Sequence, residues 1–297
     1  MELAIIFGAC GQTGHYLQKI LADQGQRVCG VGRSGGERRV DIRDFSQVEP
    51  LIRELRPDRI FHLAANSTTH HAAIFENQAT IMDGTIHVLE AAKRHAPEAR
   101  IFITGSGLQF VNDGRPIDEQ ASFHASSPYA LARISSAYAA RYYRSLGLRV
   151  YVGYLFNHES PLRPVRHVSQ MVARAAAAIA AGRQAALEIG DLTVSKEWTF
   201  AGDTAAAIST LVNQDTIQEA VIGSGMPFTI QQWVEACFSC LNKDWRDFVR
   251  ARDDFRAQYH MLVSDPKTIQ QLGWRPKVSF DELASMMVHH AADSAPD

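Results

Sequence analysis

The stretch that decides the fold lies near the start of the sequence, where residues Leu3 to Gly14 read LAIIFGACGQTG. The apolar run Leu3–Phe7 predicts a buried β-strand, and the pattern from Gly14 to Gln24 predicts a helix. Glycines in such a turn let the backbone approach a pyrophosphate, which the N–H groups of the helix then bind. The spacing is G-x-x-G-x-x-G, and we predict dinucleotide binding by Gly8, Gly11, Gln12, Thr13 and Gly14.

The rest of the first half alternates short apolar runs with helical patterns. Further strands are predicted at Arg27–Val31, Arg59–Leu63, Ile101–Thr104 and Arg149–Leu155, and helices at Ala79–Ala92 and Ser127–Ser145. Strands rich in Ile, Val and Phe that alternate with helices predict an α/β fold with a doubly wound parallel sheet of the Rossmann type. Its crossover connections should be right-handed.

The pattern changes after Phe156. Residues Asn157–Val168 contain two prolines and are predicted to form a loop. The later helices are predicted at Val168–Ala181, Gly202–Leu211, Thr229–Leu241, Asp265–Gln271 and Phe280–His290. We therefore predict a cofactor-binding domain of residues 1–160 plus about 199–222, and a smaller mixed α/β substrate-binding lobe of residues 161–198 and 223–297.

Composition and charge exclude several classes of protein. The 297 residues include 30 Lys and Arg against 32 Asp and Glu, and this net charge of −2 argues against a nucleic-acid binder. No stretch approaches the roughly 18 to 20 apolar residues of a membrane helix, and no secretory signal is recognised. We expect no membrane contact and cytoplasmic residence. Cys237 and Cys240 lie within a predicted helix, so we expect buried helix cysteines there and no metal site.

The end of the second strand indicates which dinucleotide binds. NAD sites commonly place an acidic residue there for the ribose 2′-hydroxyl, whereas an arginine accommodates a 2′-phosphate. This chain has Arg33 and Ser34, which predict NADP, with NAD as the alternative. Asp41 and Ile42 are predicted at the adenine. Further cofactor contacts are predicted from residues at the ends of later strands, namely Leu63, Ala64, Ala65 and Leu155.

A serine, a tyrosine and a cation form the predicted catalytic group. Tyr129 and Arg133 are four residues apart on a predicted helix and therefore share one face. A fixed cation stabilises a phenolate, so such a tyrosine can exchange a proton with a carbonyl or hydroxyl group. Ser106 follows a strand at the carboxyl edge of the sheet and can hydrogen-bond the same oxygen. Tyr129 and Arg133 are also predicted to contact the cofactor.

These features together resemble an extended short-chain dehydrogenase/reductase. The more specific likeness lies in Gly153–Pro161, GYLFNHESP, which resembles the substrate loop of GDP-mannose 4,6-dehydratases. Residues Gly190–Trp198 resemble that family's nucleotide-contacting stretch. This second stretch and residues Leu272–Pro276 are also similar to GDP-4-keto-6-deoxymannose reductases. The resemblance implies the Ser/Thr role for Ser106 and the acid/base role for Tyr129.

Two positions depart from the resembled family. Arg133 stands where the family has a lysine that binds the nicotinamide ribose, and arginine differs from lysine in shape and in its hydrogen-bond fork. Activity with this arginine is open: it can persist, be slow or be lost. Leu108 stands where the dehydratases carry the glutamate that helps remove the C5 proton and expel water from C6. Elimination therefore lacks its base unless Glu119 or another carboxylate substitutes.

The remaining predicted residues would bind a nucleotide-diphosphate sugar. Arginine binds diphosphate best through paired contacts, and Lys196 stands where the resembled family usually has arginine. Asn157 would hold the sugar or diphosphate, and Trp198 would pack near the nucleotide. The full predicted substrate set is Asn66, Ser106, Gly107, Leu108, Asn157, Glu159, Arg163, Arg166, Val168, Lys196, Trp198 and Arg256.

The leading functional hypothesis is NADP-dependent reduction of the keto group of a nucleotide-activated 4-keto deoxysugar. The resemblance implies a GDP-linked substrate, although the sequence itself does not establish guanine as the base. One alternative is a 4,6-dehydratase or epimerase with an altered site. Another is a catalytically inactive homologue that still binds nucleotide. The resemblance also implies a homodimer formed through the helix that carries Tyr129.

Overall fold

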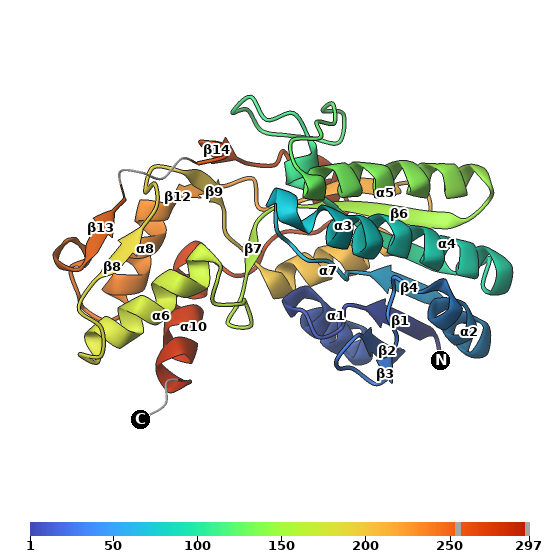
Figure 1. The fold of residues 1–297 in the computed structure, drawn as a ribbon, viewed down its shortest axis with the longest axis horizontal. Helices are drawn as coiled ribbons and strands as arrows, with labels where there is room; N and C mark the ends of the chain where they lie inside the picture. The colour runs from blue at the N-terminus through green and yellow to red at the C-terminus, as the bar shows by residue number, and fades with distance from the viewer. Residues whose placement is uncertain (253–256, 295–297) are drawn as a thin grey trace.

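A seven-stranded parallel sheet forms the centre of the larger lobe. The structure is a computed structural model that describes residues 1–252 and 257–294. The strand order is β11-β6-β5-β4-β1-β2-β3, and all neighbours are parallel (Figure 1). The strands span Leu3–Phe7 (β1), Arg27–Gly32 (β2), Arg38–Arg39 (β3), Arg59–His62 (β4), Arg100–Ser106 (β5), Arg149–Leu155 (β6) and Glu219–Ile222 (β11). This arrangement confirms the predicted doubly wound sheet.

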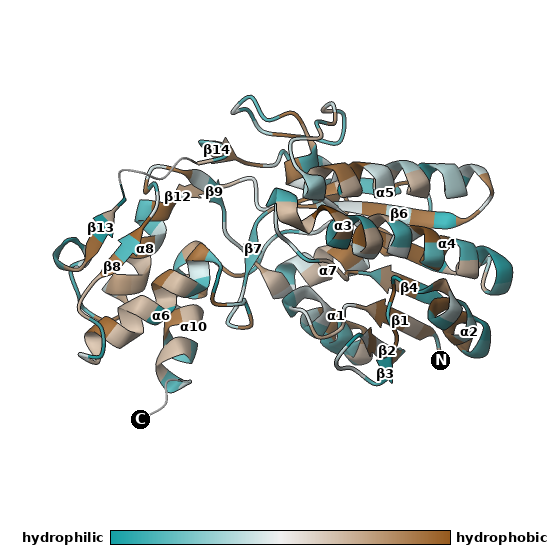
Figure 2. Cartoon of the chain, in the orientation of Figure 1, coloured by the Kyte–Doolittle hydropathy of each residue, from teal (hydrophilic) through white to brown (hydrophobic). Residues whose placement is uncertain are grey.

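Helices bury both faces of the sheet. Ala4 and Ile6 of β1 pack in one apolar core with helices α1 and α7, whereas Ile5 and Phe7 pack in another with α2, α4 and α5. Successive side chains of a strand point to opposite faces, so a strand covered on both faces is apolar throughout. The central strands are accordingly mostly brown in Figure 2. The helices are α1 Gln12–Asp23, α2 Phe45–Leu55, α4 Gly84–His95, α5 Pro128–Ser145 and α7 Ala201–Val212.

Several elements differ from the sequence-based expectation. Strand β11 was not predicted. Helix α2 was not predicted either, because it buries only Val48, Leu51 and Ile52 and contains an internal proline. The helix expected at residues 79–92 begins as a π-helical segment, Gln78–Asp83, before α4. The π-helical segment is preceded by a short 3₁₀ turn at His71–Ala73 and by helix α3 at Ile74–Asn77.

The second lobe has its own apolar core. This core contains Trp198, Trp233 and Met287, and it lies apart from the two cores of the sheet. We propose that it marks the predicted substrate-binding lobe. The elements are α6 Val168–Ala180, α8 Ile230–Ser239, α10 Phe280–Asp293, β8 Leu187–Ile189, β9 Ser195–Glu197, β12 Pro227–Thr229, β13 Val249–Ala251 and β14 Met261–Leu262. Helix α9, Lys267–Gln271, instead packs Ile269 into a core of the seven-stranded sheet.

A two-stranded pairing lies where the chain passes between the lobes. The expected loop at Asn157–Val168 contains strand β7, His158–Glu159, which pairs with β10, Thr199–Phe200. The sequence does not reveal a strand this short, because its pairing partner is distant in the chain. Within the described residues, none of the helices is both long and apolar enough to cross a bilayer.

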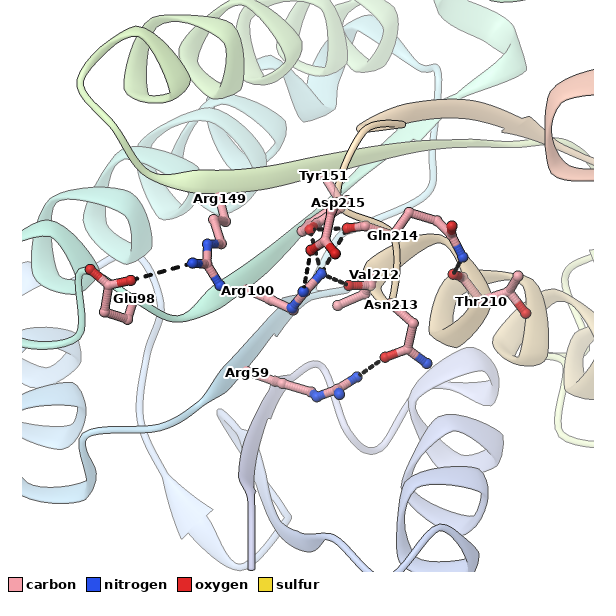
Figure 3. Close-up of polar contacts among 10 residues, drawn as sticks. All are labelled: Arg59, Glu98, Arg100, Arg149, Tyr151, Thr210, Val212, Asn213, Gln214 and Asp215. Carbon is pink, nitrogen blue, oxygen red and sulfur yellow. Dashed lines mark hydrogen bonds and ion pairs between the residues drawn. The ribbon is translucent and has the colours of Figure 1, made fainter. Parts of the chain in front are cut away.

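The amino-terminal edge of the sheet is tied to the end of α7 (Figure 3). The Arg100 guanidinium donates to the carbonyl oxygens of Val212 and Gln214, at 2.9 and 2.7 Å, and to the Tyr151 hydroxyl at 2.7 Å. It also pairs with Asp215 at 2.6 Å. These bonds satisfy carbonyl groups that a helix end leaves without partners. They fix the edge of the sheet that faces away from the cleft described below.

Candidate active site

The carboxyl ends of the central strands border a cleft. Strand β1 has β2 on one side and β4 on the other, and such a switch in strand order opens a crevice. The crevice consists of two adjoining cavities of about 400 and 430 Å³. The residues that line both are Gly8, Cys10, Gly11, Leu63, Ala65 and Arg166.

The glycine turn has the shape of a phosphate cradle. Gly8 has φ +89°, and a Cβ there would lie 2.7 Å from the Ala64 nitrogen. A Cβ on Gly14 would lie 2.4 Å from the Gly8 carbonyl oxygen, so both positions require glycine for packing. A Cβ on Gly11 would meet only the Gly8 oxygen, at 3.4 Å, and would otherwise project into the cleft. The space beside Gly11 therefore accepts a ligand group close to the backbone.

The first turn of α1 leaves its N–H groups for a ligand. Gly11 precedes the helix and supplies no side-chain cap, and no acidic residue lies in the first turn. The side chain of Gln12 bonds instead to the His158 carbonyl at 2.9 Å and accepts from the Ser160 hydroxyl at 2.8 Å. Free N–H groups at a helix N-terminus bind phosphate groups. The predicted residues Gln12 and Thr13 thus offer their backbone to the cleft.

The second cavity is lined by the residues predicted to hold the adenosine end. These are Arg33, Ser34, Asp41, Ile42, Leu63, Ala64 and Ala65, together with Asn66. Arg33 is exposed and has no hydrogen bond or ion pair within the described residues. The Asp41 carboxylate is bound by Arg43 at 2.9 Å, and this bond holds the pKa of Asp41 below its ordinary value. A free cation and an engaged carboxylate fit a 2′-phosphate better than a bare ribose.

Ser106 and Tyr129 open to the first cavity. Ser106 is the last residue of β5, and its hydroxyl oxygen accepts the backbone N–H of Leu108 at 3.2 Å. Its own backbone N–H donates to Gln109 at 2.8 Å. These contacts fix the serine and leave its hydroxyl hydrogen for an oxygen in the cleft. Tyr129 lies in the first turn of α5, which Ser127 caps by accepting from the Ala130 N–H at 3.1 Å.

Arg133 holds a buried positive charge beside the tyrosine. Its side chain lies one turn along α5 and is only 3% exposed. Its Nη1 donates to the Thr104 carbonyl oxygen at 2.6 Å, and its Cζ lies 5.1 Å from the Tyr129 ring centroid. The guanidinium is therefore anchored to β5 while its charge faces the phenol ring. Because Arg133 also lines the cavity, its charge can reach both the tyrosine and a bound ligand.

Two histidines near the cleft are neutral: His158 lines the first cavity, whereas His62, the last residue of β4, lines neither cavity. His158 donates from Nδ1 to the Phe156 carbonyl at 2.8 Å, and its Nε2 is 2.9 Å from the Thr13 hydroxyl. Burial, with a further contribution from Arg163, lowers the pKa of His158 to about 4. Burial, with a further contribution from Arg133, lowers the pKa of His62 to about 3. Both rings are therefore uncharged at neutral pH.

These histidines should make stability fall in mild acid. The unfolded chain binds protons at its histidines near pH 6.5, whereas the folded chain does not until the pH reaches about 4 or about 3. The free energy of unfolding should be constant above pH 7 and decrease below pH 6.5, by up to about 1.4 kcal/mol per pH unit for each histidine. Urea unfolding at pH 7.5, 6, 5 and 4.5 measures this slope.

A pair of variants isolates the contribution of His62. His62→Gln should reduce the slope between pH 6.5 and 4.5, whereas replacing the exposed His71 by Gln should leave it unchanged. Hydrogen bonds lower the pKa of Glu219 to about 2. Such carboxylates lose their contribution to the free energy of unfolding only below about pH 4.5. An unchanged slope in His62→Gln would show that His62 is protonated in the folded protein.

The first cavity holds the predicted catalytic residues Ser106 and Tyr129, and we call it the catalytic cavity. The described residues that line it include no Asp or Glu, and Leu108 occupies the wall beside Ser106. Glu119, the alternative base, accepts from the Val221 N–H at 2.6 Å and from the Thr268 hydroxyl at 3.1 Å. Its carboxylate thus protects edge strand β11 and does not line the cavity.

The predicted substrate residues fall into two groups. Those that line the two cavities are Asn66, Ser106, Leu108, Asn157, Arg163 and Arg166. Gly107 lines neither of the two and borders a separate cavity beside Leu108. Glu159, Val168, Lys196 and Trp198 do not line the catalytic cavity. Arg256 lies outside the described residues.

Three of the residues outside the cavity wall are buried. Trp198 stacks on Trp233 with ring centroids 4.5 Å apart, and its Nε1 donates to the Phe228 carbonyl. Lys196 lies over Trp198, and burial lowers the pKa of its ammonium group. Glu159 is 1% exposed and accepts from Ser169 at 2.5 Å. Packing of the second lobe thus keeps Lys196 and Trp198 away from the catalytic cavity, and Trp198 borders a separate cavity of that lobe. Their contact with the substrate stays a prediction.

His167 was not predicted from the sequence. This residue precedes α6 and lines the catalytic cavity, and its buried Nε2 has no hydrogen-bond partner among the described residues. Burial, with a further contribution from Arg163, lowers its pKa to about 4. Its position next to Arg166 was the only signal available in the sequence.

Comparison with known proteins agrees with this geometry. Residues 5–287 match the family model described as GDP-mannose 4,6 dehydratase. GDP-mannose 4,6 dehydratase 2 of Arabidopsis thaliana is 30% identical, over 97% of this chain and 86% of that relative. GDP-mannose 4,6-dehydratase of Vibrio cholerae is 28% identical, over 96% of this chain and 92% of that relative.

Solved structures share the fold. RMD from Pseudomonas aeruginosa, complexed with NADPH, has a TM-score of 0.88 and 22% identity, and covers 99% of this chain and 100% of its own. UDP-glucose 4-epimerase of Thermus thermophilus, in complex with NAD, has a TM-score of 0.85 and 21% identity, over 99% of this chain and 100% of its own. At this level of identity the similarity establishes the fold alone.

Proposed function

This chain belongs to the GDP-mannose 4,6-dehydratase family, and we propose that it binds NADP and a GDP-linked sugar and catalyses hydride transfer at C4 of the sugar. The observation that carries this proposal is the shared cavity of Ser106, Tyr129, Arg133 and the glycine turn. NADP is supported by Arg33 and by the NADPH complex of the structural neighbour. GDP is supported by the names of the relatives.

The residues of the cleft supply proton transfer and charge. NADP, when bound, supplies the hydride acceptor or donor. Tyr129 takes the proton from the C4 hydroxyl during oxidation, or returns one to the C4 oxygen during reduction. Ser106 donates a hydrogen bond to the same oxygen, and Arg133 stabilises the phenolate through its buried charge.

Two reactions can use this cleft. The named relatives favour a 4,6-dehydratase over the reductase, which was the leading hypothesis from the sequence. In a 4,6-dehydratase, elimination of water follows oxidation at C4. One observation favours the reductase as the second candidate: Leu108 supplies no base, and no described residue of the cavity wall is a carboxylate. Reduction of a ketone needs no C5 proton removal, so it does not require that base.

A three-part assay separates the candidates. Purified protein is incubated with GDP-mannose and NADP, with GDP-4-keto-6-deoxymannose and NADPH, or with NADPH alone, and the sugars are separated by chromatography. Conversion of GDP-mannose to the 4-keto-6-deoxy sugar supports the dehydratase, and NADPH oxidation by the keto sugar supports the reductase. Cofactor binding without turnover of either sugar would overturn catalysis and leave the inactive homologue.

Arg33 should decide the preference between the two dinucleotides. Arg33→Ala is expected to weaken NADPH binding about tenfold or more, because a charge-assisted contact to the 2′-phosphate is lost. NADH binding should change less than twofold. Quenching of protein fluorescence measures both dissociation constants, and Arg53→Ala, on the exposed side of α2, serves as the charge-loss control. Equal weakening of both dinucleotides would contradict a 2′-phosphate contact.

Helix α5 supports the predicted homodimer, which we retain as a proposal. Outward-facing side chains on this helix include Leu131, Tyr138 and Tyr142, which are 45%, 58% and 60% exposed. Apolar groups gathered on an exposed surface are typical of protein interfaces. Sedimentation velocity should give a mass near twice 32.9 kDa, and Tyr138→Glu should shift it toward the monomer. A monomeric wild-type protein at micromolar concentration would refute the dimer.

A further inference from the structure

Arg166 reaches the cofactor cleft from the second lobe. It lies on the loop that precedes α6, yet it lines both the catalytic cavity and the adenosine cavity. The other residues common to both cavities come from the glycine turn and the end of β4. Arg166 is exposed and has no hydrogen bond or ion pair within the described part of the chain. Its guanidinium is therefore available to a ligand at the junction.

The neighbouring arginine is already engaged. The Nε of Arg163 lies 3.1 Å from Oε2 of Glu159, a carboxylate that also accepts from Ser169. Glu159 is buried, and Arg163 helps keep its pKa below the ordinary value against the effect of burial. Arg163 therefore neutralises a buried charge, whereas Arg166 has no comparable partner in residues 1–252 and 257–294. Two arginines from one loop thus differ in what they can bind.

We propose that Arg166 binds the pyrophosphate of the cofactor, opposite the N-terminus of α1. This inference rests on the proposed function, in which the two cavities hold the two halves of NADP. The pyrophosphate joins those halves and must cross the junction where Gly11 and Arg166 both line the wall. Helix N–H groups on one side and a guanidinium on the other give a dianion charge-assisted hydrogen bonds from both sides.

The assignment changes the predicted role of Arg166. From its position after the substrate-loop motif, Arg166 was predicted to bind the diphosphate of the sugar nucleotide. At the junction of the cavities it is a positioning residue for the cofactor. Because it belongs to the segment leading into α6, the bound cofactor would hold this loop against the glycine turn. Release of the cofactor would then require the loop to move.

Equilibrium binding without any sugar nucleotide tests the proposal. Arg166→Ala should raise the dissociation constants of NADPH and NADH alike, by about tenfold or more, because both carry the pyrophosphate. Arg166→Lys should lose less affinity for both dinucleotides than Arg166→Ala, because lysine keeps the charge but lacks the planar hydrogen-bond fork. Binding of 2′-AMP, which has the 2′-phosphate but no pyrophosphate, should change less than twofold. Arg174→Ala, an exposed charge loss within α6, is the matched control.

Other outcomes would overturn the assignment. Unchanged NADPH binding together with weaker GDP binding would show that Arg166 contacts the sugar nucleotide and not the cofactor. Weaker binding of NADPH and 2′-AMP with NADH unchanged would place it on the 2′-phosphate. A wild-type protein that binds neither dinucleotide would refute the proposed function itself. Circular dichroism melting of each variant shows whether the fold is retained, and a folded Arg166→Ala with wild-type affinity for both dinucleotides ends the proposal.

Discussion

Tyr129→Phe is expected to lower the rate of hydride transfer about 10²- to 10⁴-fold, the contribution typical of general acid–base catalysis. The substitution removes only the hydroxyl group, so the ring keeps its place beside Arg133. The ring also stays buried, because Tyr129 is only 8% exposed. Oxidation at C4 then has no group to take the proton, and reduction has none to supply it. The affinity for NADPH should change less than threefold, because the cradle of α1 is untouched.

Stopped-flow absorbance at 340 nm measures this rate, and fluorescence quenching measures cofactor affinity. Tyr142→Phe is the matched control, since this tyrosine lies on the same helix and is 60% exposed. It should retain the wild-type rate. Retention of more than a tenth of the rate by Tyr129→Phe would show that another group transfers the proton. Parallel loss of rate and cofactor affinity would instead indicate a structural role for the hydroxyl.

Leu108→Glu is expected to raise the rate of water elimination from GDP-mannose about 10²- to 10⁴-fold. Leu108 lines the catalytic cavity two residues after Ser106, so a carboxylate there would face the sugar. The ketone at C4 acidifies the C5 proton, and a base near that carbon removes it. The rate of hydride transfer at C4 should change little, because Ser106, Tyr129 and Arg133 are retained. The measurement is formation of the 4-keto-6-deoxy product, with solvent deuterium entering at C5.

Leu108→Gln is the control for size and polarity, since it lacks a basic oxygen and should not raise elimination. Equal rates in wild type and Leu108→Glu, with substantial elimination in both, would show that another group already acts as the base. His167 would then be the next residue to test, because its ring is neutral and its Nε2, at the cavity wall, has no hydrogen-bond partner in the described part of the chain. No elimination in either protein, with keto-sugar reduction in both, would favour the reductase.

Local patterns in the sequence predicted the cofactor end of the site. Continuous apolar strands, the glycine spacing and a basic residue after β2 place Gly8, Gly11 and Arg33 in one cleft. Each of these signals depends on residues that are neighbours in the chain. The same holds for Tyr129 and Arg133, whose spacing on one helix face needs only helical periodicity.

The second lobe was harder to predict, because its motifs carry no information on burial. Lys196 and Trp198 belong to a stretch that resembles a nucleotide contact, yet Trp233 of α8 stacks on Trp198 and closes it from solvent. Only the packing of distant helices decides this. The structure similarly engages the carboxylate of Glu119 at the edge of the sheet, where Val221 donates to it.

Local patterns of the sequence specify the sheet, the glycine turn and the proposed catalytic serine, tyrosine and arginine, since strand and helix periodicity and turn chemistry depend on near neighbours in the chain. The tertiary structure decided which charges remain free. Arg163 is engaged by a buried carboxylate, whereas Arg166 extends from one lobe to the cofactor cavities of the other. The availability of a charged group depends on every element packed around it, and that packing joins segments that are distant in the chain.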